Sequence, residues 1–382
     1  EEIMLGFALG AFVFQQITAN DIDSVLVANN RTANFRDQNS FKANYRFDNR
    51  KGRTINVDID YGRFRNDTRR FQPNRYFNGS RDVLLTEIID SFFTPTDIDI
   101  YTFKLDYEED LFGGKLGLGT KLSRVESDND FIVFAQENGE YTQDNTRSNN
   151  FVYDENVYAG YISYARQLNE KWSLSTGVRA EQTDALGVLT VFDISKEEDP
   201  LPPLQYLSWF PSAGLTWQVA RQHTLALNYG LRINRPDYNV LNPFENQLSE
   251  LSFEKGNPGL RPEIVNNIEL GYTLAYRYNF KIGYSQTVDQ ITRLIGPDDV
   301  DERASFIKWD NLADQKIVSM NISAPTQITE KWSAFFNASA SYINNQADYG
   351  EGAVVDVQAF TYSIYQQHTF TLPAGLKGEV SG

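Results

Sequence analysis

The sequence contains no cysteine and only two histidines among its 382 residues. The lack of cysteine excludes disulfide scaffolds, thiol nucleophiles and cysteine-based zinc sites, and it suits a periplasmic folding route. No apolar run reaches the roughly 18 residues that a transmembrane helix needs. The longest apolar run, Ile3 to Phe14, follows Glu1 and Glu2 instead of Lys or Arg. We therefore interpret this run as a strand and expect the chain to start after any signal peptide.

Clustered positive charge is also missing, because the formal net charge is −16. A nucleic-acid partner is therefore not expected, since phosphate binding needs Lys and Arg clusters. The mean hydropathy of −0.46 is that of a water-soluble chain, yet 14% of the residues are aromatic, with 21 Tyr and 26 Phe. Membrane barrels combine these traits, because half of each strand faces lipid and half faces water.

Strict alternation of apolar and polar residues is the dominant pattern. One face of each such run is apolar, as in 225–233, 268–276, 55–61 and 101–107, and the other face is polar or small. This period of two predicts strands with one apolar face. We expect about fifteen or sixteen strands, many with the roughly nine residues that a tilted strand needs to cross a bilayer.

The predicted connections alternate between short and long. Short turns are expected at 49–52, 113–114, 168–171, 220–222, 277–279, 328–331 and 373–375. Long polar loops are expected at 65–97, 127–154, 184–203, 235–261, 296–303 and 345–356. Such sorting indicates an all-β transmembrane antiparallel barrel with short periplasmic turns and long extracellular loops. Residues 1–382 are expected to form this one domain; a large soluble β-sandwich is the disfavoured alternative.

Two local features refine this expectation. Trp172 and Trp332 each begin a strand after a short turn and follow a Glu-Lys pair, which indicates an aromatic girdle at the lipid headgroups. The alternative is packing in a soluble core. Residues 80–93 have the spacing of a short amphipathic helix, which could cap the barrel mouth; a solvated loop is the alternative.

One region resembles a known family. The segments Asn234-Arg235-Pro236 and Leu241-Asn242-Pro243-Phe244 are followed by Gly256-Asn257-Pro258-Gly259-Leu260-Arg261-Pro262-Glu263 and by a strand. This order resembles the barrels of TonB-dependent receptors, particularly those abundant in Bacteroidetes. The resemblance implies a 22-stranded barrel, an N-terminal plug and a segment that engages TonB. The chain is then expected to be a barrel fragment without the plug and the last strands.

The candidate contacts to a ligand or to the plug are inward-facing or lie where strands join loops. They are Arg232, Asn234, Arg235, Glu263, Asp58, Asp60 and Arg179. Plain solvation of a wide interior, and loop architecture built by Pro and Gly, are the alternative interpretations. Other inward-facing polar residues are expected at Asn56, Lys104, Asp106, Glu108, Lys121, Glu181 and Glu269.

Bond chemistry is not expected. His223 and His368 lie in predicted strands, and the nearest partners for a hydrolase arrangement, Ser363 and Glu379, follow no catalytic spacing. No metal site or cofactor is predicted. The acidic groups 126–130, 197–199 and 298–302 could hold Ca²⁺, which would bridge lipopolysaccharide, but charge runs are usually solvated.

The sequence therefore predicts a receptor in the outer membrane of a Gram-negative cell that imports a scarce solute with energy from TonB. The solute would be a siderophore, cobalamin, a glycan or a peptide. The expected partners are lipid and lipopolysaccharide, the protein's own plug domain, the TonB system and a surface lipoprotein. The alternative is a structural or adhesion barrel that does not transport.

Overall fold

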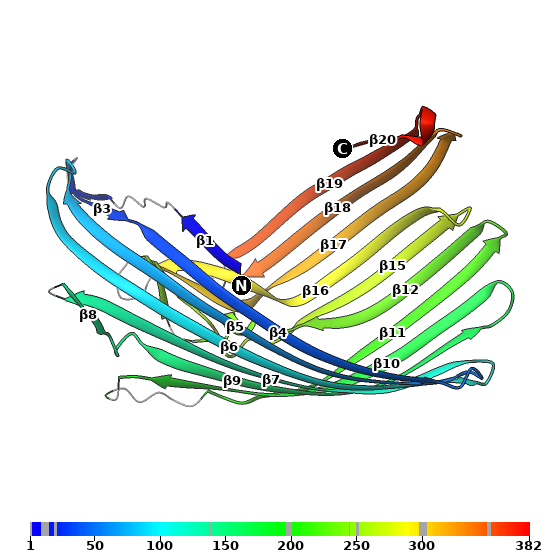
Figure 1. Cartoon of the computed structure of the whole chain (residues 1–382), viewed down its shortest axis with the longest axis horizontal. Coiled ribbons are helices and arrows are strands. Elements are labelled where there is room, and N and C mark those ends of the chain that lie inside the picture. Colours follow the sequence, from blue (N-terminus) through cyan, green and yellow to red (C-terminus); the bar gives the residue numbers. More distant parts are fainter. Residues whose placement is uncertain are drawn as a thin grey trace.

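The chain forms one large curved β-sheet of 20 strands (Figure 1). The computed structural model describes residues 2–8, 15–18, 21–137, 139–193, 195, 201–243, 245–249, 252–297, 304–349 and 353–382. No helix in this part of the chain is long and apolar enough to cross a membrane.

Neighbouring wall strands pair in antiparallel register. The wall strands are β1 (Glu2–Ala8), β4 (Asn30–Asp48), β5 (Arg53–Asn78), β6 (Leu84–Leu111), β7 (Gly114–Glu137), β9 (Asn149–Gln167), β10 (Trp172–Val191), β11 (Leu204–Ala220), β12 (His223–Asn234), β15 (Glu263–Leu274), β16 (Tyr278–Pro297), β17 (Ser305–Thr329), β18 (Trp332–Asp348), β19 (Val354–Thr371) and β20 (Lys377–Ser381). The predicted number of about fifteen or sixteen strands agrees with this wall.

Shorter elements join the sheet from the connections between wall strands. They are β2 (Gln15–Thr18), β3 (Asp21–Ala28), β8 (Glu140–Gln143), β13 (Glu245–Ser249), β14 (Ser252–Lys255) and the 3-10 helices η1 (Tyr238–Val240) and η2 (Pro373–Gly375). The described residues show no pairing between β4 and either β19 or β20, so the sheet is open.

The predicted sorting of the connections is confirmed. The short turns lie together at the right end of Figure 1, and the long connections lie at the opposite end. Local chemistry builds the tight turns: Asn49 Oδ1 accepts hydrogen bonds from the backbone nitrogens of Lys51 and Arg53 at 2.8 and 2.9 Å. Gly52 and Gly113 have φ of +91° and +73°, a region that disfavours a side chain. The predicted short turns therefore follow from a few adjacent residues.

The predicted long loops 65–97 and 127–154 are wrong in large part, because most of their residues continue the strands. β5, β6 and β7 have 26, 28 and 24 residues, well beyond a bilayer crossing. The helix or solvated loop predicted over 80–93 is likewise wrong, because β6 begins at Leu84. The Asn78 side chain closes the preceding turn by accepting hydrogen bonds from the backbone nitrogens of Asp82 and Val83 at 3.1 Å.

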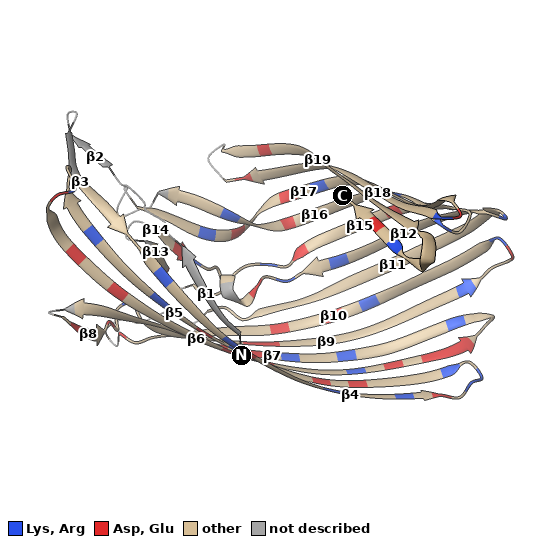
Figure 2. Ribbon diagram, turned by 45° about the horizontal axis from the view of Figure 1, so that its top comes forward, with Lys and Arg blue, Asp and Glu red and all other residues tan. Residues whose placement is uncertain are grey.

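The two faces of the wall differ as the alternation predicts. Large apolar side chains on the outer face are open: Ile59 is 50% exposed, Trp209 59% and Ile282 55%. No second layer of protein covers them in the described part of the chain. The inner face is polar along the part that faces the apolar band. Toward the long connections it is buried and also carries apolar side chains, such as Phe92, Phe131 and Val133. Charged residues recur along most wall strands and form no single block (Figure 2). The outer face is therefore the lipid-facing surface.

Aromatic side chains mark both borders of the apolar band. At the turn end, Trp172 stacks on Trp217 with ring centroids 5.1 Å apart, and Trp332 stacks on Phe370 at 5.7 Å. Toward the opposite end, the Tyr61–Tyr101 ring pair at 5.1 Å is the last aromatic pair before charged residues follow on the outer face. The positions of both tryptophans agree with the predicted girdle at the headgroups.

Candidate functional site

The connection between β12 and β15, described over residues 235–243, 245–249 and 252–262, folds into the barrel interior; we call these described residues the luminal bridge. A long extracellular loop was predicted over 235–261. Instead, the β13–β14 hairpin lies between β5 and β6 on one side and β17 on the other (Figure 2). The bridge therefore obstructs part of the space that the wall encloses.

Hydrogen bonds attach the bridge to opposite parts of the wall. On one side, Arg70 donates to the backbone oxygen of Gln247 at 2.6 Å, and Arg147 donates to Gln247 Oε1 at 3.2 Å. On the other side, β14 pairs in parallel with residues 305–308 of β17, and Asn257 Nδ2 donates to the Trp309 backbone oxygen at 3.1 Å. The hairpin is thus held from both sides.

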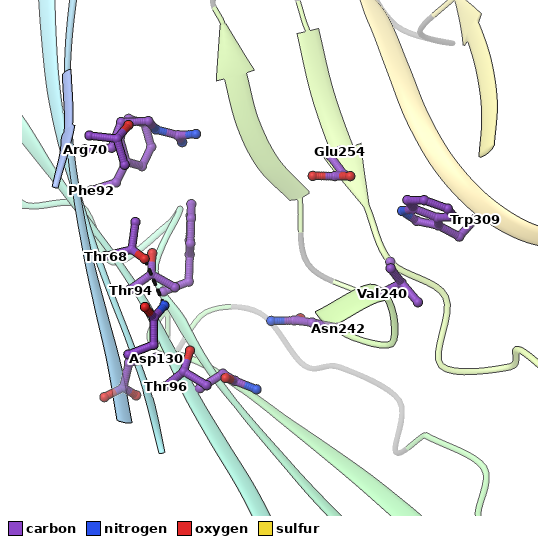
Figure 3. Close-up of a pocket in the computed structure, with 15 residues that line it drawn as sticks. Thr68, Arg70, Phe92, Thr94, Thr96, Asp130, Val240, Asn242, Glu254 and Trp309 are labelled. Carbon is purple, nitrogen blue, oxygen red and sulfur yellow. Dashed lines mark hydrogen bonds between the residues drawn. The ribbon is translucent and has the colours of Figure 1, made fainter. Parts of the chain in front are cut away.

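A cavity of about 370 Å³ lies between the bridge and the inner face of β4–β7 (Figure 3). The wall contributes threonines, Asn66, Asn129, Asp130 and the rings of Phe92 and Phe131. The bridge contributes Val240, Asn242 and Glu254, and Trp309 of β17 completes the far side. Its volume is within the range of small-molecule sites.

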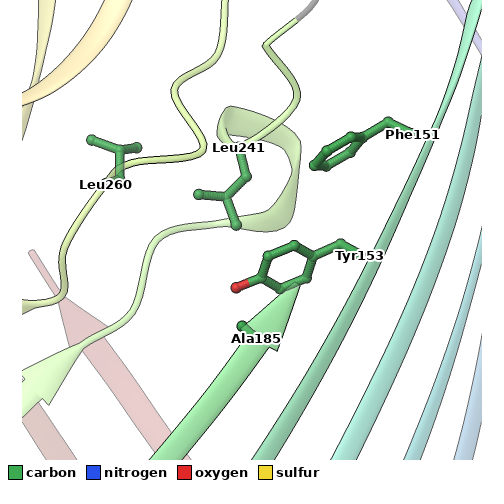
Figure 4. Close-up of a cluster of buried hydrophobic side chains, with 5 residues drawn as sticks. All are labelled: Phe151, Tyr153, Ala185, Leu241 and Leu260. Atoms are coloured by element: carbon green, nitrogen blue, oxygen red, sulfur yellow. The ribbon is translucent and has the colours of Figure 1, made fainter. Parts of the chain in front are cut away.

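A buried apolar cluster fixes the bridge to β9 and β10. Leu241 and Leu260 of the bridge pack with Phe151, Tyr153 and Ala185, and all five are buried (Figure 4). Full burial of an aliphatic side chain stabilises by about 1.5–3 kcal/mol. The two leucines of the family-like motif are therefore structural anchors.

Tyr238 of η1 extends this anchorage. Its ring lies 5.5 Å from that of Tyr153, and its hydroxyl donates to Glu155 Oε1 at 3.3 Å. Burial and the nearby Glu155 carboxylate raise the pKa of Tyr238, so the phenol stays protonated. The hydroxyl can therefore remain a donor across the physiological pH range.

Gly256 and Asn257 give the motif its local shape. The Asn257 backbone nitrogen donates to Val240 O at 2.7 Å, and its side chain accepts a hydrogen bond from the Gly259 nitrogen at 2.9 Å. A Cβ on Gly256 would lie 2.2 Å from Asn242 O and 2.6 Å from Val240 O. Glycine is thus required by close backbone approach, whereas the sequence had suggested turn geometry.

Three of the predicted site residues hold the base of the bridge. Arg235 donates to Glu181 Oε2 at 2.7 Å and to Thr183 Oγ1 at 3.1 Å. Burial alone would lower the pKa of Arg235, but the bond to Glu181 and the neighbouring acidic groups raise it, so the guanidinium stays charged. Asn234 donates to Glu263 Oε2 at 3.1 Å, which joins the two strands that flank the bridge.

Glu263 also accepts a backbone hydrogen bond at an irregularity in the sheet. The β16–β17 register shifts around Gln290, and Asp289 has a φ of +56°. Glu263 Oε1 accepts a hydrogen bond from the Ile291 backbone nitrogen at 2.9 Å, which satisfies a donor beside this bulge. The role of Glu263 and Asn234 in the structure is therefore to hold the strands.

Replacing Glu263 by alanine is expected to destabilise the base of the bridge by about 1–2 kcal/mol, because it leaves the Ile291 nitrogen and Asn234 without this acceptor. Hydrogen exchange of the Ile291 amide measures this change. Glu269→Ala on the same strand is the matched control, since Glu269 has only an exposed pair with Lys281 at 3.1 Å. Equal exchange in both variants would contradict the assigned role.

Arg179 joins the same polar group, because its Nε lies 2.5 Å from Glu181 Oε1. Its guanidinium also lies over the Tyr161 ring, 5.8 Å from the centroid. Arg232 lines an adjacent cavity of about 570 Å³ together with Arg179, Glu181 and Arg235. The Arg232 side chain has no hydrogen bond or ion pair among the described residues. The structure thus brings Arg179 and Arg235 together on Glu181, with Arg232 lining the same cavity.

Asp58 and Asp60 lie apart from this group, on β5 beside β4. Asp58 accepts hydrogen bonds from Asn44 and Asn56, both at 2.6 Å, and Asp60 lies 3.9 Å from Lys42. Their inward position agrees with the alternation of β5, and Lys104 on β6 lies opposite Asp58 in register. They lie on β5 nearer the turn end than Arg70, the residue of this strand that binds the bridge.

Sequence reasoning missed the residues that hold the hairpin. Arg147 donates to both oxygens of the buried Asp90 at 2.9 Å and also binds Asp144 and Gln247. Burial and the bonds from Thr146 and Arg147 act in opposite directions on Asp144, and the net effect is a lowered pKa. No short-range motif marks Asp90 and Arg147, because they are separated by 57 positions.

The acidic residues that the structure describes among 126–130 are bound to neighbouring side chains. Asn150 donates to Asp128 and Asp130 at 2.6 and 2.9 Å, and Glu126 pairs with Arg124. Among the described residues, no three His, Asp or Glu side chains converge as metal ligands. The groups 197–199 and 298–302 lie outside the described residues.

Both histidines lie among aromatic residues near the turn end. His223 Nδ1 is 2.6 Å from the Tyr272 hydroxyl, and the Trp332 indole donates to His368 Nδ1 at 3.2 Å. Ser363 and Glu379 are register partners of Ser339 and Thr369, respectively. The pairings considered for catalysis are therefore not formed here.

A sheet with an exposed apolar outer band, aromatic borders and a polar, partly bridged interior defines a β-barrel of the outer membrane. The chain belongs to the outer membrane protein beta-barrel family, which matches residues 45–382. The protein is located in the outer membrane. No curated protein matches it.

Solved structures of outer-membrane transporters share the fold. The copper transporter OprC matches with a TM-score of 0.53 at 10% identity, over 94% of this chain and 71% of that chain. The RagAB peptide transporter matches with 0.51 at 14% identity, over 96% and 46%. The siderophore receptor PiuA from Acinetobacter baumannii matches with 0.50 at 12% identity, over 95% and 69%. The fold expected from the resemblance is thus confirmed, and the family match makes the chain an outer-membrane β-barrel.

Proposed function

We propose that the chain forms the barrel wall of a receptor that imports a scarce solute, with energy from the TonB system of the inner membrane. The luminal bridge carries this proposal. It crosses a polar interior and is held on both sides by hydrogen bonds, through Gln247 and Asn257. A bridged interior suits a controlled passage better than an open, water-filled pore.

In this proposal, the inward-facing charges meet a plug domain of the same protein. The Arg232 side chain, which has no partner among the described residues, is available to it at the adjacent 570 Å³ cavity, where Arg179 lies paired with Glu181. TonB would act on the plug, and a surface lipoprotein would assist from outside, while lipid and lipopolysaccharide surround the apolar band. The wall performs no bond chemistry and carries no cofactor.

The shared fold with siderophore, copper and peptide transporters supports import and leaves the solute open. Depletion of medium components, measured by mass spectrometry, tests the proposal. Wild-type cells are compared with a strain lacking this gene and a strain lacking tonB. At least one solute should be depleted by wild-type cells and by neither mutant. Identical depletion by all three strains would refute energised import.

A second candidate function, adhesion or structural support, is favoured by the length of two strands at one end of the barrel. β5 and β6 extend far beyond a bilayer crossing and form a paired hairpin up to Asn78 and Leu84. Replacing residues 75–87, the tip of this hairpin beyond the residues that contact the bridge or line the cavity, by a short turn separates the two functions. Loss of surface attachment with unchanged uptake would identify the hairpin tip as an adhesion surface.

A further inference from the structure

The 370 Å³ cavity between the wall and the luminal bridge is lined on its wall side mainly by short neutral polar side chains. Thr32, Thr68, Thr94 and Thr96 come from three neighbouring strands, and Asn66 lies among them. Antiparallel register places Asn66 opposite Thr96 and Thr68 opposite Thr94, so their side chains share the inner face. The wall therefore presents a patch of short neutral groups (Figure 3).

Several of these hydroxyls are available to a solute. The Thr68 hydroxyl is already used, because it donates to Asn34 Oδ1 at 2.9 Å and accepts from Asn66 Nδ2 at 3.1 Å. The hydroxyls of Thr32, Thr94 and Thr96 have no hydrogen-bond partner in the part of the chain that is described. Each can donate one hydrogen bond and accept others.

The opposite side of the cavity adds an acceptor and a ring. Glu254 of β14 has no hydrogen bond among the described residues, and its carboxylate can accept from neighbouring hydroxyls. The Trp309 ring borders the same space, with the Arg293 guanidinium 5.6 Å from its centroid. An aromatic ring of this kind offers a flat apolar surface with a polar edge.

The charges at the cavity argue against a strongly ionic solute. Arg70 already donates to Gln247, and Asp130 accepts from Asn150. One carboxylate, that of Glu254, and one guanidinium, that of Arg70, therefore face the space, because Asp130 follows the inward-facing Asn129 and its carboxylate lies on the other face of β7. One carboxylate is too few to hold a hard cation without other ligands, and in a chain whose net charge is −16 a multiply negative solute would be repelled.

We propose that this cavity is a binding subsite for an uncharged, hydroxyl-rich solute such as a short neutral oligosaccharide. The unpaired threonine hydroxyls on one side match sugar hydroxyls in both directions, Glu254 accepts from adjacent ones, and Trp309 covers an apolar ring face. The assignment deepens the proposed import function and rests on it, because the cavity is taken as a point on the solute's path.

Binding to the purified full-length protein in detergent tests the subsite. The probes are an array of neutral oligosaccharides, a set of uncharged tripeptides, and citrate, with affinities measured by calorimetry. At least one oligosaccharide should bind saturably. The double variant Thr94→Val with Thr96→Val keeps the side-chain volume and removes two hydroxyls. The Kd of this variant for the oligosaccharide should rise about tenfold or more, because each removed hydroxyl loses one hydrogen bond.

Thr361→Val is the matched control, because Thr361 lies on β19, away from the cavity, and its hydroxyl has no hydrogen bond among the described residues. Heat-dependent migration on denaturing gels checks that each variant is folded. No binding of any oligosaccharide, preference for tripeptides or citrate, or equal affinity of both variants would overturn the subsite. Because these are affinities in detergent, their failure is distinct from a failure of uptake in cells.

Discussion

Replacing Gly256 by alanine should release the luminal bridge from the wall. The new Cβ would meet two backbone oxygens, Asn242 O at 2.2 Å and Val240 O at 2.6 Å, and neither can rotate away as a side chain could. Overpacking of this kind costs about 1–3 kcal/mol, and we expect the upper end. At about 1.4 kcal/mol for each factor of ten, protection from hydrogen exchange should fall roughly a hundredfold.

The amides that report this change are those within the turn. Leu241, Asn257 and Leu260 donate to backbone oxygens of the bridge at 3.2, 2.7 and 3.3 Å. Gly230→Ala in β12 is the matched control, because a Cβ there meets nothing within 4 Å. Mass-spectrometric exchange should show fast exchange over 238–262 only in the Gly256 variant. Unchanged protection there would show that the bridge adapts to the added methyl group.

The membrane-crossing part of the fold could be predicted from the sequence because its signals are local. Alternation in 55–61 and 101–107 reports the apolar outer face directly, since lipid covers it in place of other parts of the chain. Asn49 with Gly52, and Gly113, define tight turns within a few residues. Neither feature depends on which distant strand lies alongside.

The parts of β5, β6 and β7 that extend beyond the membrane could not be predicted, because the alternation of apolar and polar residues is lost there. Beyond Tyr61 the outer face meets water, and cross-strand ion pairs take the place of apolar residues. Arg65 lies opposite Asp97, with Nε 2.7 Å from the carboxylate. Polar and charged residues are frequent on both faces of such segments, so they read as loops, although backbone pairing continues through them.

The candidate site was predicted in part. Arg179, Arg232 and Arg235 do gather, because strand ends next to a long connection face the interior. Asn234 and Glu263 lie close to them, but their hydrogen bonds hold neighbouring strands together. The partners that position the hairpin are 100 and 177 residues away from Gln247, so no spacing in the sequence could reveal them.

Replacing Asp90 by asparagine should destabilise both the segment 139–149 and the luminal bridge. Asp90 has a side chain only 2% exposed and holds Arg147 through both oxygens at 2.9 Å, while Arg147 reaches Gln247. Asp90→Asn leaves a partly buried guanidinium without its counter-charge. Breaking a fully buried pair costs about 3–5 kcal/mol. Because the Arg147 side chain is 35% exposed, we expect about 2–3 kcal/mol.

The expected result is a loss of exchange protection by roughly 30- to 100-fold in residues 139–149 and 245–249, at about 1.4 kcal/mol per factor of ten. Asp97→Asn on the same strand is the control. Asp97 also contacts two arginines, Arg63 at 3.3 Å and Arg65 at 2.7 Å, but its side chain is 40% exposed. Exposed pairs contribute about 1 kcal/mol or less, so a change below about fivefold is expected. Similar losses in both variants would mean that burial of Asp90 does not set the strength of this contact, and that Arg147 does not hold the hairpin against the wall.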